Sequence, residues 1–331
     1  MSDTQLPLVL ISHSLPAGWL DPLECQCKSV VGPVDATHLS DELVKLLPEA
    51  EGLFVLLTIR IDETILEKAP RLKVISNMAV GVDNIDLEAC THRGLPVGNT
   101  PGVLTQGTAD LAMALLLATA RRLVEASRDA REGRWKTWSP TGWLGKDLVG
   151  ATLGILGMGQ IGQAVAERAR GFGMRLIFSD PNPRQEVVEK LGAEPVPLER
   201  LLRESDFLTV HVPLTAATRR LIDAKALKQM KPDAILINTS RGPVVDTKAL
   251  VTALQEGWIA GAGLDVTDPE PLPPDHPLFK LPNCLIVPHI GSATRNTRKH
   301  MALRACENLL AGLQGRRLPF CANPEVYEQS I

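Results

Sequence analysis

Three polar side chains directly follow three apolar segments in the second half of the chain. Arg241 follows "DAILINTS", Glu270 follows "AGAGLDVTDP", and His289 follows "CLIVP". Arginine presents a planar fork of donors that can hold a carboxylate and polarise an adjacent carbonyl. Histidine can give or take a proton near neutral pH, and a carboxylate beside it favours its protonated form. The three residues therefore offer a fixed cation, an acid and a titratable imidazole.

A glycine-rich turn stands upstream of these residues. Gly157, Gly159 and Gly162 have the spacing G-x-G-x-x-G, after the apolar run Thr152–Leu156 and before the Ala-rich run Gln163–Arg170. At this spacing the glycines allow a tight turn, a close approach of the backbone to a pyrophosphate, and close packing of helix on strand. The first N–H groups of the helix would face the phosphates. The strand, turn and helix together predict a dinucleotide site.

The acidic residue that ends the next apolar run bears on the choice of dinucleotide. Asp180 closes the run that begins at Arg175. A carboxylate at this place can accept hydrogen bonds from the ribose hydroxyls and would repel a 2′-phosphate, which favours NAD(H). Arg184 follows in "DPNPR" and could meet such a phosphate, so NADP(H) stays open.

The predicted nucleotide site favours a catalytic role for Arg241, Glu270 and His289. Each of them alone is common in loops and turns. In a doubly wound sheet, however, the carboxyl ends of the strands lie at one edge, where ligands bind. A cation for a carboxylate, a proton donor for a carbonyl and a bound dinucleotide together indicate reversible hydride transfer between 2-oxo and 2-hydroxy acids.

Apolar β-type runs alternate with helical patterns along the whole chain, which predicts an α/β protein. In the first 100 residues we expect strands at Pro7–Ser12, Leu53–Leu57 and Lys73–Ser76. One helix is expected from Val103 to about Glu132, and an amphipathic helix from Ala293 to about Leu313. The second series of strands is predicted at Thr152–Leu156, Arg175–Ser179, Phe207–Val212, Ala234–Asn238, Ala260–Val266 and Leu285–Val287.

Six apolar strands with helical crossovers indicate a doubly wound, mainly parallel Rossmann sheet. A length of 331 residues suits about two domains. We expect the nucleotide domain at residues 101–290, inserted into a smaller flavodoxin-like α/β substrate domain formed by residues 1–100 and 291–331.

Composition excludes several other classes of protein. The formal net charge of −3 gives no basic field for nucleic acid or an anionic membrane. The longest apolar stretch, "LAMALLLATA", is short of the ~20 residues that a membrane span needs. Six scattered cysteines suit reduced thiols and form no metal-site pattern, and the N-terminus has no signal-peptide pattern. We therefore expect a cytoplasmic protein without a metal.

With these motifs in place, the whole chain resembles the D-isomer-specific 2-hydroxyacid dehydrogenase family, and within it the glyoxylate and hydroxypyruvate reductases. Seven blocks have the family's order. They are "AVGVDNID" at 79–86, "NTPGVLTQGTADLAMALLLATARR" at 99–122, "LGILGMGQIGQAVA" at 153–166, "ESDFLTVHVPLT" at 204–215, "INTSRGPVVD" at 237–246, "AGAGLDVTDPEPL" at 260–272 and "VPHIGSAT" at 287–294.

The resemblance implies roles for individual residues. Arg241, Glu270 and His289 would form the catalytic set, and the active site would lie in a cleft between two lobes. The substrate would meet Leu57, the backbone amides of Val80 and Gly81, Arg241 and His289. The implied cofactor contacts are Thr108, Gly157, Met158, Gly159, Gln160, Ile161, Gly162, Asp180, Val212, Pro213, Thr218, Thr239, Ser240, Arg241, Asp265, His289 and Gly291.

Two further expectations come from the resemblance. Family members are typically homodimers through the long helix region, and in some reductases a tryptophan of the partner subunit reaches the active site. Trp138, in a cluster with Trp135 and Trp143, is the candidate for that tryptophan. Phosphite dehydrogenases of the family have a lysine where this chain has Val80, which counts against phosphite oxidation.

The sequence leaves other functions open. The enzyme could act on another small D-2-hydroxy acid, such as D-lactate or 3-phosphoglycerate. Apolar Leu57 and Val80 in the implied substrate segments favour a small substrate without a phosphate. A non-catalytic, NAD-sensing corepressor is the alternative from a different class, and only the absence of turnover would identify it.

Overall fold

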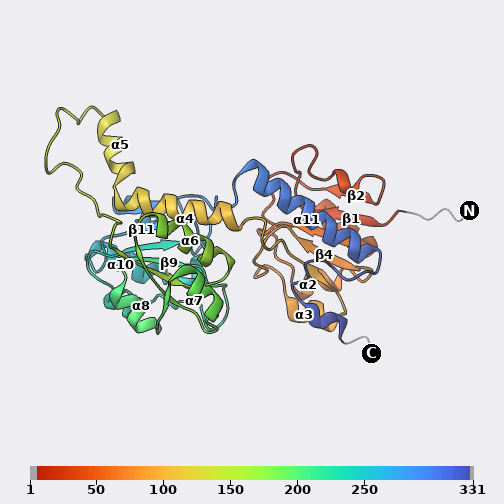
Figure 1. Ribbon diagram of the computed structural model, residues 1–331. Coiled ribbons are helices and arrows are strands. Elements are labelled where there is room, and N and C mark those ends of the chain that lie inside the picture. The colour runs from red at the N-terminus through yellow and green to blue at the C-terminus, as the bar shows by residue number, and fades with distance from the viewer. Residues whose placement is uncertain (1–5, 329–331) are drawn as a thin grey trace, which may run out of the picture. The chain divides into compact units, whose positions relative to one another are not determined.

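The computed structural model describes residues 6–328, and the chain forms two compact units, coloured by residue number in Figure 1. Unit 1 comprises the chain up to Leu104 and again from Thr294, and unit 2 comprises Thr105–Ala293. The sequence placed the corresponding boundaries at about residues 100 and 290. No helix among the described residues is long and apolar enough to cross a membrane.

Unit 1 is built on a parallel sheet of five strands in the order β2-β1-β3-β4-β5. The apolar side chains of β1, β3 and β4 are buried, and the three strands match the runs predicted from the sequence. The edge strand β2 is mostly exposed and β5 has two residues, so neither has the apolar run that predicts a strand. The bounds are β1 Leu8–Ile11, β2 Lys28–Val31, β3 Gly52–Val55, β4 Val74–Asn77 and β5 Val97–Gly98.

Helices cover the sheet of unit 1. The last long helix, α11 (Arg295–Leu313), packs on β3 and β4 although more than 200 residues separate them in the chain. Gly312 permits this contact, because a Cβ atom there would lie 2.4 Å from Cβ of Val74. The other helices are α1 Asp41–Leu46, α2 Glu63–Glu67 and α3 Leu87–His92, with short 3₁₀ turns at Asp21–Leu23, Leu47–Glu49 and Pro324–Tyr327.

Unit 2 contains a parallel sheet of seven strands in the order β12-β11-β10-β9-β6-β7-β8. From β6 the chain builds outward first through β7 and β8, and then in the other direction from β9 to β12. This is the doubly wound Rossmann arrangement that the sequence predicted, and ligands bind beside its switch point. The bounds are β6 Thr152–Leu156, β7 Arg175–Ser179, β8 Glu194–Pro195, β9 Phe207–Val210, β10 Ile235–Asn238, β11 Gly261–Leu264 and β12 Cys284–Ile286.

Helices lie on both faces of this sheet (Figure 1), and each face has its own apolar core. One core is formed with α4, α6 and α7, and the other with α8, α9 and α10. The bounds are α4 Thr105–Ala120, α6 Gln160–Gly171, α7 Gln185–Leu191, α8 Leu198–Glu204, α9 Ala224–Gln229 and α10 Thr247–Gln255, with 3₁₀ turns at Gly242–Val244 and Pro277–Lys280.

The single long helix expected from Val103 to Glu132 is wrong. The chain forms α4 and then α5 (Leu123–Arg131), which leaves the direction of α4 (Figure 1). Arg122 between them has a left-handed backbone with φ 53°. The N–H of Lys146 donates to the carbonyl of Ala120 at 2.8 Å, so that carbonyl is not left for a continuing helix. α5 has no buried residue, so no core contact holds it in line with α4.

Candidate active site

Arg241, Glu270 and His289 all lie beyond the carboxyl ends of neighbouring strands in unit 2. Arg241 follows β10, Glu270 follows β11 and His289 follows β12, and these three strands are adjacent in the sheet. The sheet order therefore places three side chains that are up to 48 positions apart in the chain at one edge.

Glu270 and His289 form a hydrogen-bonded pair. Nδ1 of His289 lies 2.6 Å from Oε1 of Glu270. The other carboxylate oxygen, Oε2, accepts the backbone N–H of Thr267 at 3.2 Å. Because an ionised carboxylate only accepts, Nδ1 is assigned as the protonated nitrogen, which leaves Nε2 of the imidazole for a reacting group.

The surroundings of Glu270 favour its ionised form. Burial alone would raise the pKa of Glu270, but the hydrogen bond and charge of His289 lower it. The N–H of Thr267 and the positive charge of Arg241 lower it further, and together they place the pKa of Glu270 below its ordinary value. Glu270 is therefore a carboxylate at neutral pH.

Asp265 fixes the backbone that presents His289. Its two carboxylate oxygens accept the N–H groups of Ile290 at 2.6 Å and of Gly291 at 2.9 Å, and its carbonyl accepts the N–H of His289 at 2.9 Å. His289 has a left-handed backbone with φ 51°, an uncommon conformation that needs such support. Burial raises the pKa of Asp265, while the N–H of Ile290, the charge of His289 and the N–H of Gly291 oppose that rise.

Arg241 is partly buried and its backbone is held in place. Its carbonyl accepts Nδ2 of Asn238 at 2.9 Å, and its Nη1 donates to the carbonyl of Ser240 at 3.0 Å. The Ser240 hydroxyl donates in turn to Oδ1 of Asn238 at 2.9 Å. The turn after β10 thus holds the arginine near Glu270, whose pKa its charge lowers.

The glycine turn has the geometry that a dinucleotide requires. A Cβ atom at Gly157, where φ is 93°, would lie 2.9 Å from the backbone of His211, and one at Gly162 would lie 2.2 Å from the carbonyl of Gly157. At Gly159, by contrast, a Cβ atom would meet nothing within 4 Å. The first and third glycines serve packing, whereas Gly159 faces open space at the start of α6, where N–H groups can bind phosphate.

Asp180 lies after β7, beside the glycine turn. Its Oδ2 accepts the N–H of Met158 at 2.8 Å, and its Oδ1 accepts the N–H of Asn182 at 2.9 Å. The carboxylate is only partly buried, so its remaining lone pairs can accept from hydroxyl groups of a ligand.

The other residues of the implied cofactor set lie in unit 2 as well. The hydroxyl of Thr239 is buried and has no hydrogen-bond partner among the described residues, as expected for a group that a ligand satisfies. Thr218 donates to the carbonyl of Pro213 at 2.6 Å and so closes the turn after Val212. A Cβ atom at Gly291 would lie 3.4 Å from the Thr108 side chain. The residues of the glycine turn that remain, Gln160 and Ile161, begin α6.

These observations fit a dinucleotide. The open space at Gly159, the helix start, the carboxylate of Asp180 and the orphaned Thr239 hydroxyl all follow strands β6, β7 and β10 of one sheet. Phosphates, ribose and nicotinamide would each find a suitable group at this edge.

Three of the residues implied for substrate binding lie on two loops of unit 1. Leu57 follows β3 and is 37% exposed, and Val80 and Gly81 follow β4 and are partly exposed. The side chains of Asn77, Asn84 and Asn99 contact these loops, and the sequence analysis did not identify them. Asn77 ends the apolar run "VIS", and a polar residue at the end of a buried strand was the available signal.

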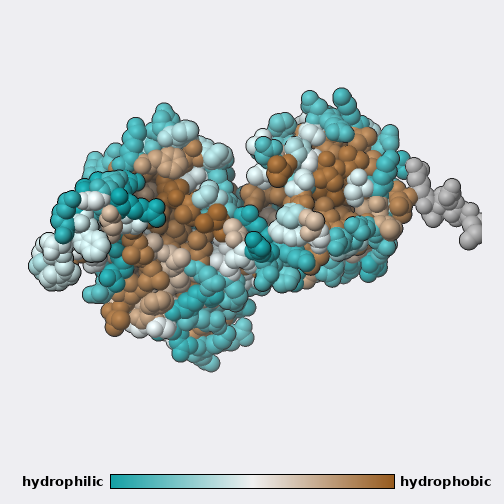
Figure 2. Space-filling model, turned by 90° about the horizontal axis from the view of Figure 1, so that it is seen from above, coloured by the Kyte–Doolittle hydropathy of each residue, from teal (hydrophilic) through white to brown (hydrophobic). Residues whose placement is uncertain are grey.

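Trp138 is 79% exposed and lies in the segment after α5. Figure 2 shows that apolar residues gather on one face of the same unit, bordered by hydrophilic ones.

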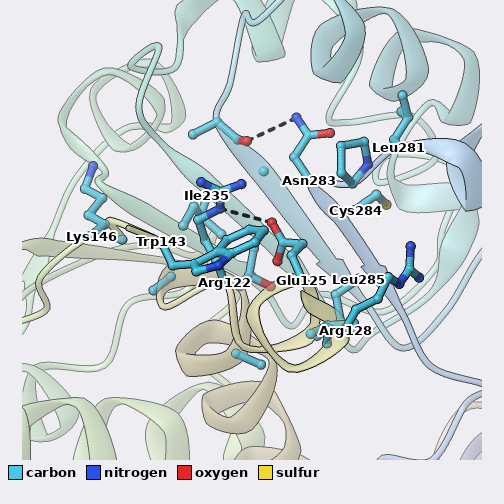
Figure 3. A pocket seen from close by; sticks show the side chains of 18 of the residues that line it. Arg122, Glu125, Arg128, Trp143, Lys146, Ile235, Leu281, Asn283, Cys284 and Leu285 are labelled. Atoms are coloured by element: carbon cyan, nitrogen blue, oxygen red, sulfur yellow. Dashed lines mark hydrogen bonds and ion pairs between the residues drawn. The ribbon is translucent and has the colours of Figure 1, made fainter. Parts of the chain in front are cut away.

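A cavity of unit 2 lies away from these residues (Figure 3). It has a volume of about 730 Å³. Arg122 stacks over Trp143 at 4.7 Å on one of its walls, beside Glu125. Ile235 and Cys284, which line it, start β10 and β12, so the cavity lies at the amino ends of the strands. None of the proposed catalytic side chains lines it.

Comparisons with known proteins show the family to which the chain belongs. The family model for the NAD binding domain of the D-isomer specific 2-hydroxyacid dehydrogenases matches residues 113–291. A glyoxylate reductase of Thermococcus litoralis is 53% identical over 328 residues, which cover 98% of this chain and 99% of the relative. A glyoxylate reductase of Korarchaeum cryptofilum is 49% identical over 321 residues, covering 97% of each chain.

Solved structures give the same result. A Thermus thermophilus protein superposes with a TM-score of 0.88 at 50% identity, covering 95% of this chain and 99% of that one. An NADPH-dependent glyoxylate/hydroxypyruvate reductase of Sinorhizobium meliloti, solved with NADP and malonate, has a TM-score of 0.84 at 34% identity, with 96% and 98% covered. The chain is a member of the D-isomer specific 2-hydroxyacid dehydrogenase family, and hence an NAD(P)-dependent oxidoreductase.

Proposed function

We propose that the protein reduces glyoxylate and hydroxypyruvate, to glycolate and D-glycerate, with NADH or NADPH. The observation that supports this most is the Glu270–His289 pair next to Arg241, at the sheet edge that also holds the glycine turn. Identity of about 50% with glyoxylate reductases over nearly the whole chain favours these substrates over other 2-oxo acids.

Each catalytic residue has a defined task in this reaction. The reduced nicotinamide, when bound, supplies a hydride to the carbonyl carbon. His289 gives the proton on Nε2 to the carbonyl oxygen, so that hydride plus proton turn the 2-oxo acid into the 2-hydroxy acid. Glu270 holds the ring through Nδ1 and stabilises its positive charge before transfer. The guanidinium of Arg241 holds the substrate carboxylate and polarises the carbonyl.

The substrate carboxylate is assigned to the backbone amides of Val80 and Gly81. The apolar side chains of Leu57 and Val80 suit a small substrate. Units 1 and 2 are accordingly proposed as the substrate-binding and nucleotide-binding domains.

For the cofactor, Asp180 favours NADH, since a carboxylate repels a 2′-phosphate. Arg184 stands at the N-cap of α7 with its guanidinium 3.7 Å from Glu186. It is the group that would support NADPH.

A cytoplasmic homodimer is the proposed state of the protein. Trp135, Trp138 and Leu144 are 72%, 79% and 66% exposed, and a group of exposed apolar side chains is typical of a protein–protein contact surface. We assign Trp138 to the active site of the partner subunit. Light scattering coupled to size-exclusion chromatography tests the dimer, and a monomer at micromolar concentration would contradict it.

Initial rates test the function directly. Oxidation of NADH and of NADPH is followed with glyoxylate, hydroxypyruvate, pyruvate and 2-oxoglutarate. Fast turnover of the first two substrates is expected, with NADH preferred. Tight NADH binding without turnover of any oxo acid would contradict the proposal and point to a sensing protein.

A further inference from the structure

Three consecutive carbonyl groups after β4 are each held by a donor from the same unit. The carbonyl of Ala79 accepts the N–H of Thr100 at 2.8 Å. That of Val80 accepts Nδ2 of Asn99 at 2.9 Å, and that of Gly81 accepts Nδ2 of Asn77 at 3.0 Å. Two of the three donors are the side-chain amides of Asn77 and Asn99, so these side chains fix the orientation of the peptide groups after β4.

The planar trans peptide fixes where the partner N–H groups point. In each peptide the N–H is directed opposite to the preceding carbonyl. Holding the carbonyls of residues 79, 80 and 81 therefore turns the N–H groups of Val80, Gly81 and Val82 the other way. Asn77 and Thr100 are fully buried, while Val80, Gly81 and Val82 are partly exposed. Within residues 6–328 none of these three N–H groups donates to a protein acceptor.

The asparagine donors are themselves fixed. Nδ2 of Asn77 also donates to Oδ1 of Asn84 at 3.1 Å, and Nδ2 of Asn84 donates to the carbonyl of Ile59 at 2.9 Å. The backbone of Asn99 is held from both sides, by Nδ2 of Asn308 at 2.9 Å and by the carbonyl of Phe320 at 3.1 Å. The loop is therefore set before any ligand binds.

We propose that Asn77 and Asn99 are positioning residues that hold the N–H groups of Val80, Gly81 and Val82 as one preformed nest for the substrate carboxylate. Successive N–H groups on one side of a chain bind anions, and carboxylates are captured in this way. A nest ordered in advance lowers the entropy cost of binding. The inference rests on the proposed function, because it refines how that function's substrate is bound.

The hydrogen bonds of these asparagines also reach the loop of Leu57. Asn84 donates to the carbonyl of Leu56 at 3.4 Å as well as to Ile59, so it joins this loop to the nest through Asn77. The apolar side chain of Leu57 and the N–H groups of the nest are thereby kept in a fixed relation within unit 1.

The test compares Asn99→Ala and Asn99→Asp with Asn323→Ala as the matched control. Asn323 is fully buried in the same unit and makes its amide hydrogen bonds to Val97, Thr91 and Leu95, away from the nest. Asn99 is preferred to the fully buried Asn77 because it is only partly buried, so we expect its variants to disturb folding less. Asn99→Asp keeps the size of the side chain but replaces the donor with an anion.

Two readouts are measured with the full-length protein. These are KM and kcat for glyoxylate with NADH, and the Kd of the non-reducible dicarboxylate oxalate by calorimetry in the presence of NADH. Loss of one positioning hydrogen bond should raise both KM and Kd about tenfold in Asn99→Ala, and more in Asn99→Asp, with the Kd of NADH unchanged. Asn323→Ala should lower the melting temperature without changing KM.

Unchanged KM and oxalate Kd in both Asn99 variants would overturn the inference, as would a wild-type protein that binds no oxalate. A variant that loses only kcat or folded protein would indicate a structural role and would also overturn it. Failure of the proposed function is distinguishable, because oxalate binding needs no turnover. In that case the wild type would reduce no oxo acid, yet the Asn99 variants would still bind oxalate more weakly than the wild type does.

Discussion

Nδ1 of His289 lies 2.6 Å from a carboxylate oxygen of Glu270, and the main chain of the histidine is bound to Asp265. Two acids thus position His289 in different ways. Glu270 fixes the ring and its protonated nitrogen, whereas Asp265 fixes the loop through the N–H groups of His289, Ile290 and Gly291. The ring is left with Nε2 for chemistry, and the following predictions start from this arrangement.

His289→Ala should lower kcat for glyoxylate roughly 10²–10⁴-fold, because general acid catalysis contributes about that much. The Kd of NADH should change little. Steady-state kinetics and NADH fluorescence titration measure the two effects, with the exposed His300→Ala as control. A kcat within threefold of the wild-type value would remove His289 from its proposed role.

Glu270→Gln keeps the shape of the side chain but removes its charge. The imidazole of His289 then loses its carboxylate partner, so we expect a lower kcat. In the wild type, the lowered pKa of Glu270 keeps it ionised through the assay range, so no acid limb from Glu270 is expected near neutrality. A kcat of Glu270→Gln that stays near the wild-type value between pH 6 and pH 10 would contradict the electrostatic role of Glu270.

Arg241→Lys should lower kcat/KM for glyoxylate by about 10²-fold or more, since an ammonium cannot reproduce a bidentate fork. If kcat/KM stayed near wild type, the bidentate argument would have to be withdrawn.

Asp180→Ala should raise the kcat/KM ratio of NADPH to NADH, because the carboxylate that repels the 2′-phosphate is gone. Asp180 also accepts the N–H of Met158 in the glycine turn, so some loss with both cofactors is expected. Asp180→Asn separates these effects, since its amide oxygen can still accept while the charge is removed. An unaltered cofactor ratio in both variants would refute the ribose assignment.

His211 predicts a pH dependence of stability. Burial lowers the pKa of His211 to about 3, its Nδ1 is buried without a partner in the described structure, and Nε2 lies 2.8 Å from the Thr209 hydroxyl. Below the ordinary pKa of about 6.5 the unfolded chain binds the proton and the folded chain does not, so stability falls with falling pH.

The measurement for His211 is urea unfolding at pH 7, 6 and 5. Between pH 6.5 and 3 the histidine should reduce the free energy of unfolding by up to about 1.4 kcal/mol per pH unit. His211→Gln, which cannot titrate, should show a shallower dependence than the wild type. Parallel curves for the two proteins would show that His211 is not the cause.

The strands of unit 2 could be predicted because burial on both faces requires continuous apolar runs. Thr152–Leu156 and Arg175–Ser179 match β6 and β7 to the residue. The edge strands β2 and β8 could not be found, since Lys28 and Glu194 face solvent and hydrogen bonding to a neighbour alone makes these segments strands. The break at Arg122 escaped notice because helix propensity does not reveal that Lys146 binds the carbonyl of Ala120.

The sequence by itself determined which chemical groups the protein has and that each follows a strand: a glycine turn, an acid after the second strand, and an arginine, a glutamate and a histidine further along. The tertiary structure alone decided that β10, β11 and β12 are neighbours, and hence that Glu270 meets His289. It alone shows that Asn77 and Asn99 hold the loop after β4. The physical reason is that a contact between residues far apart in the chain depends on strand order and on individual hydrogen bonds, which local apolar patterns do not encode.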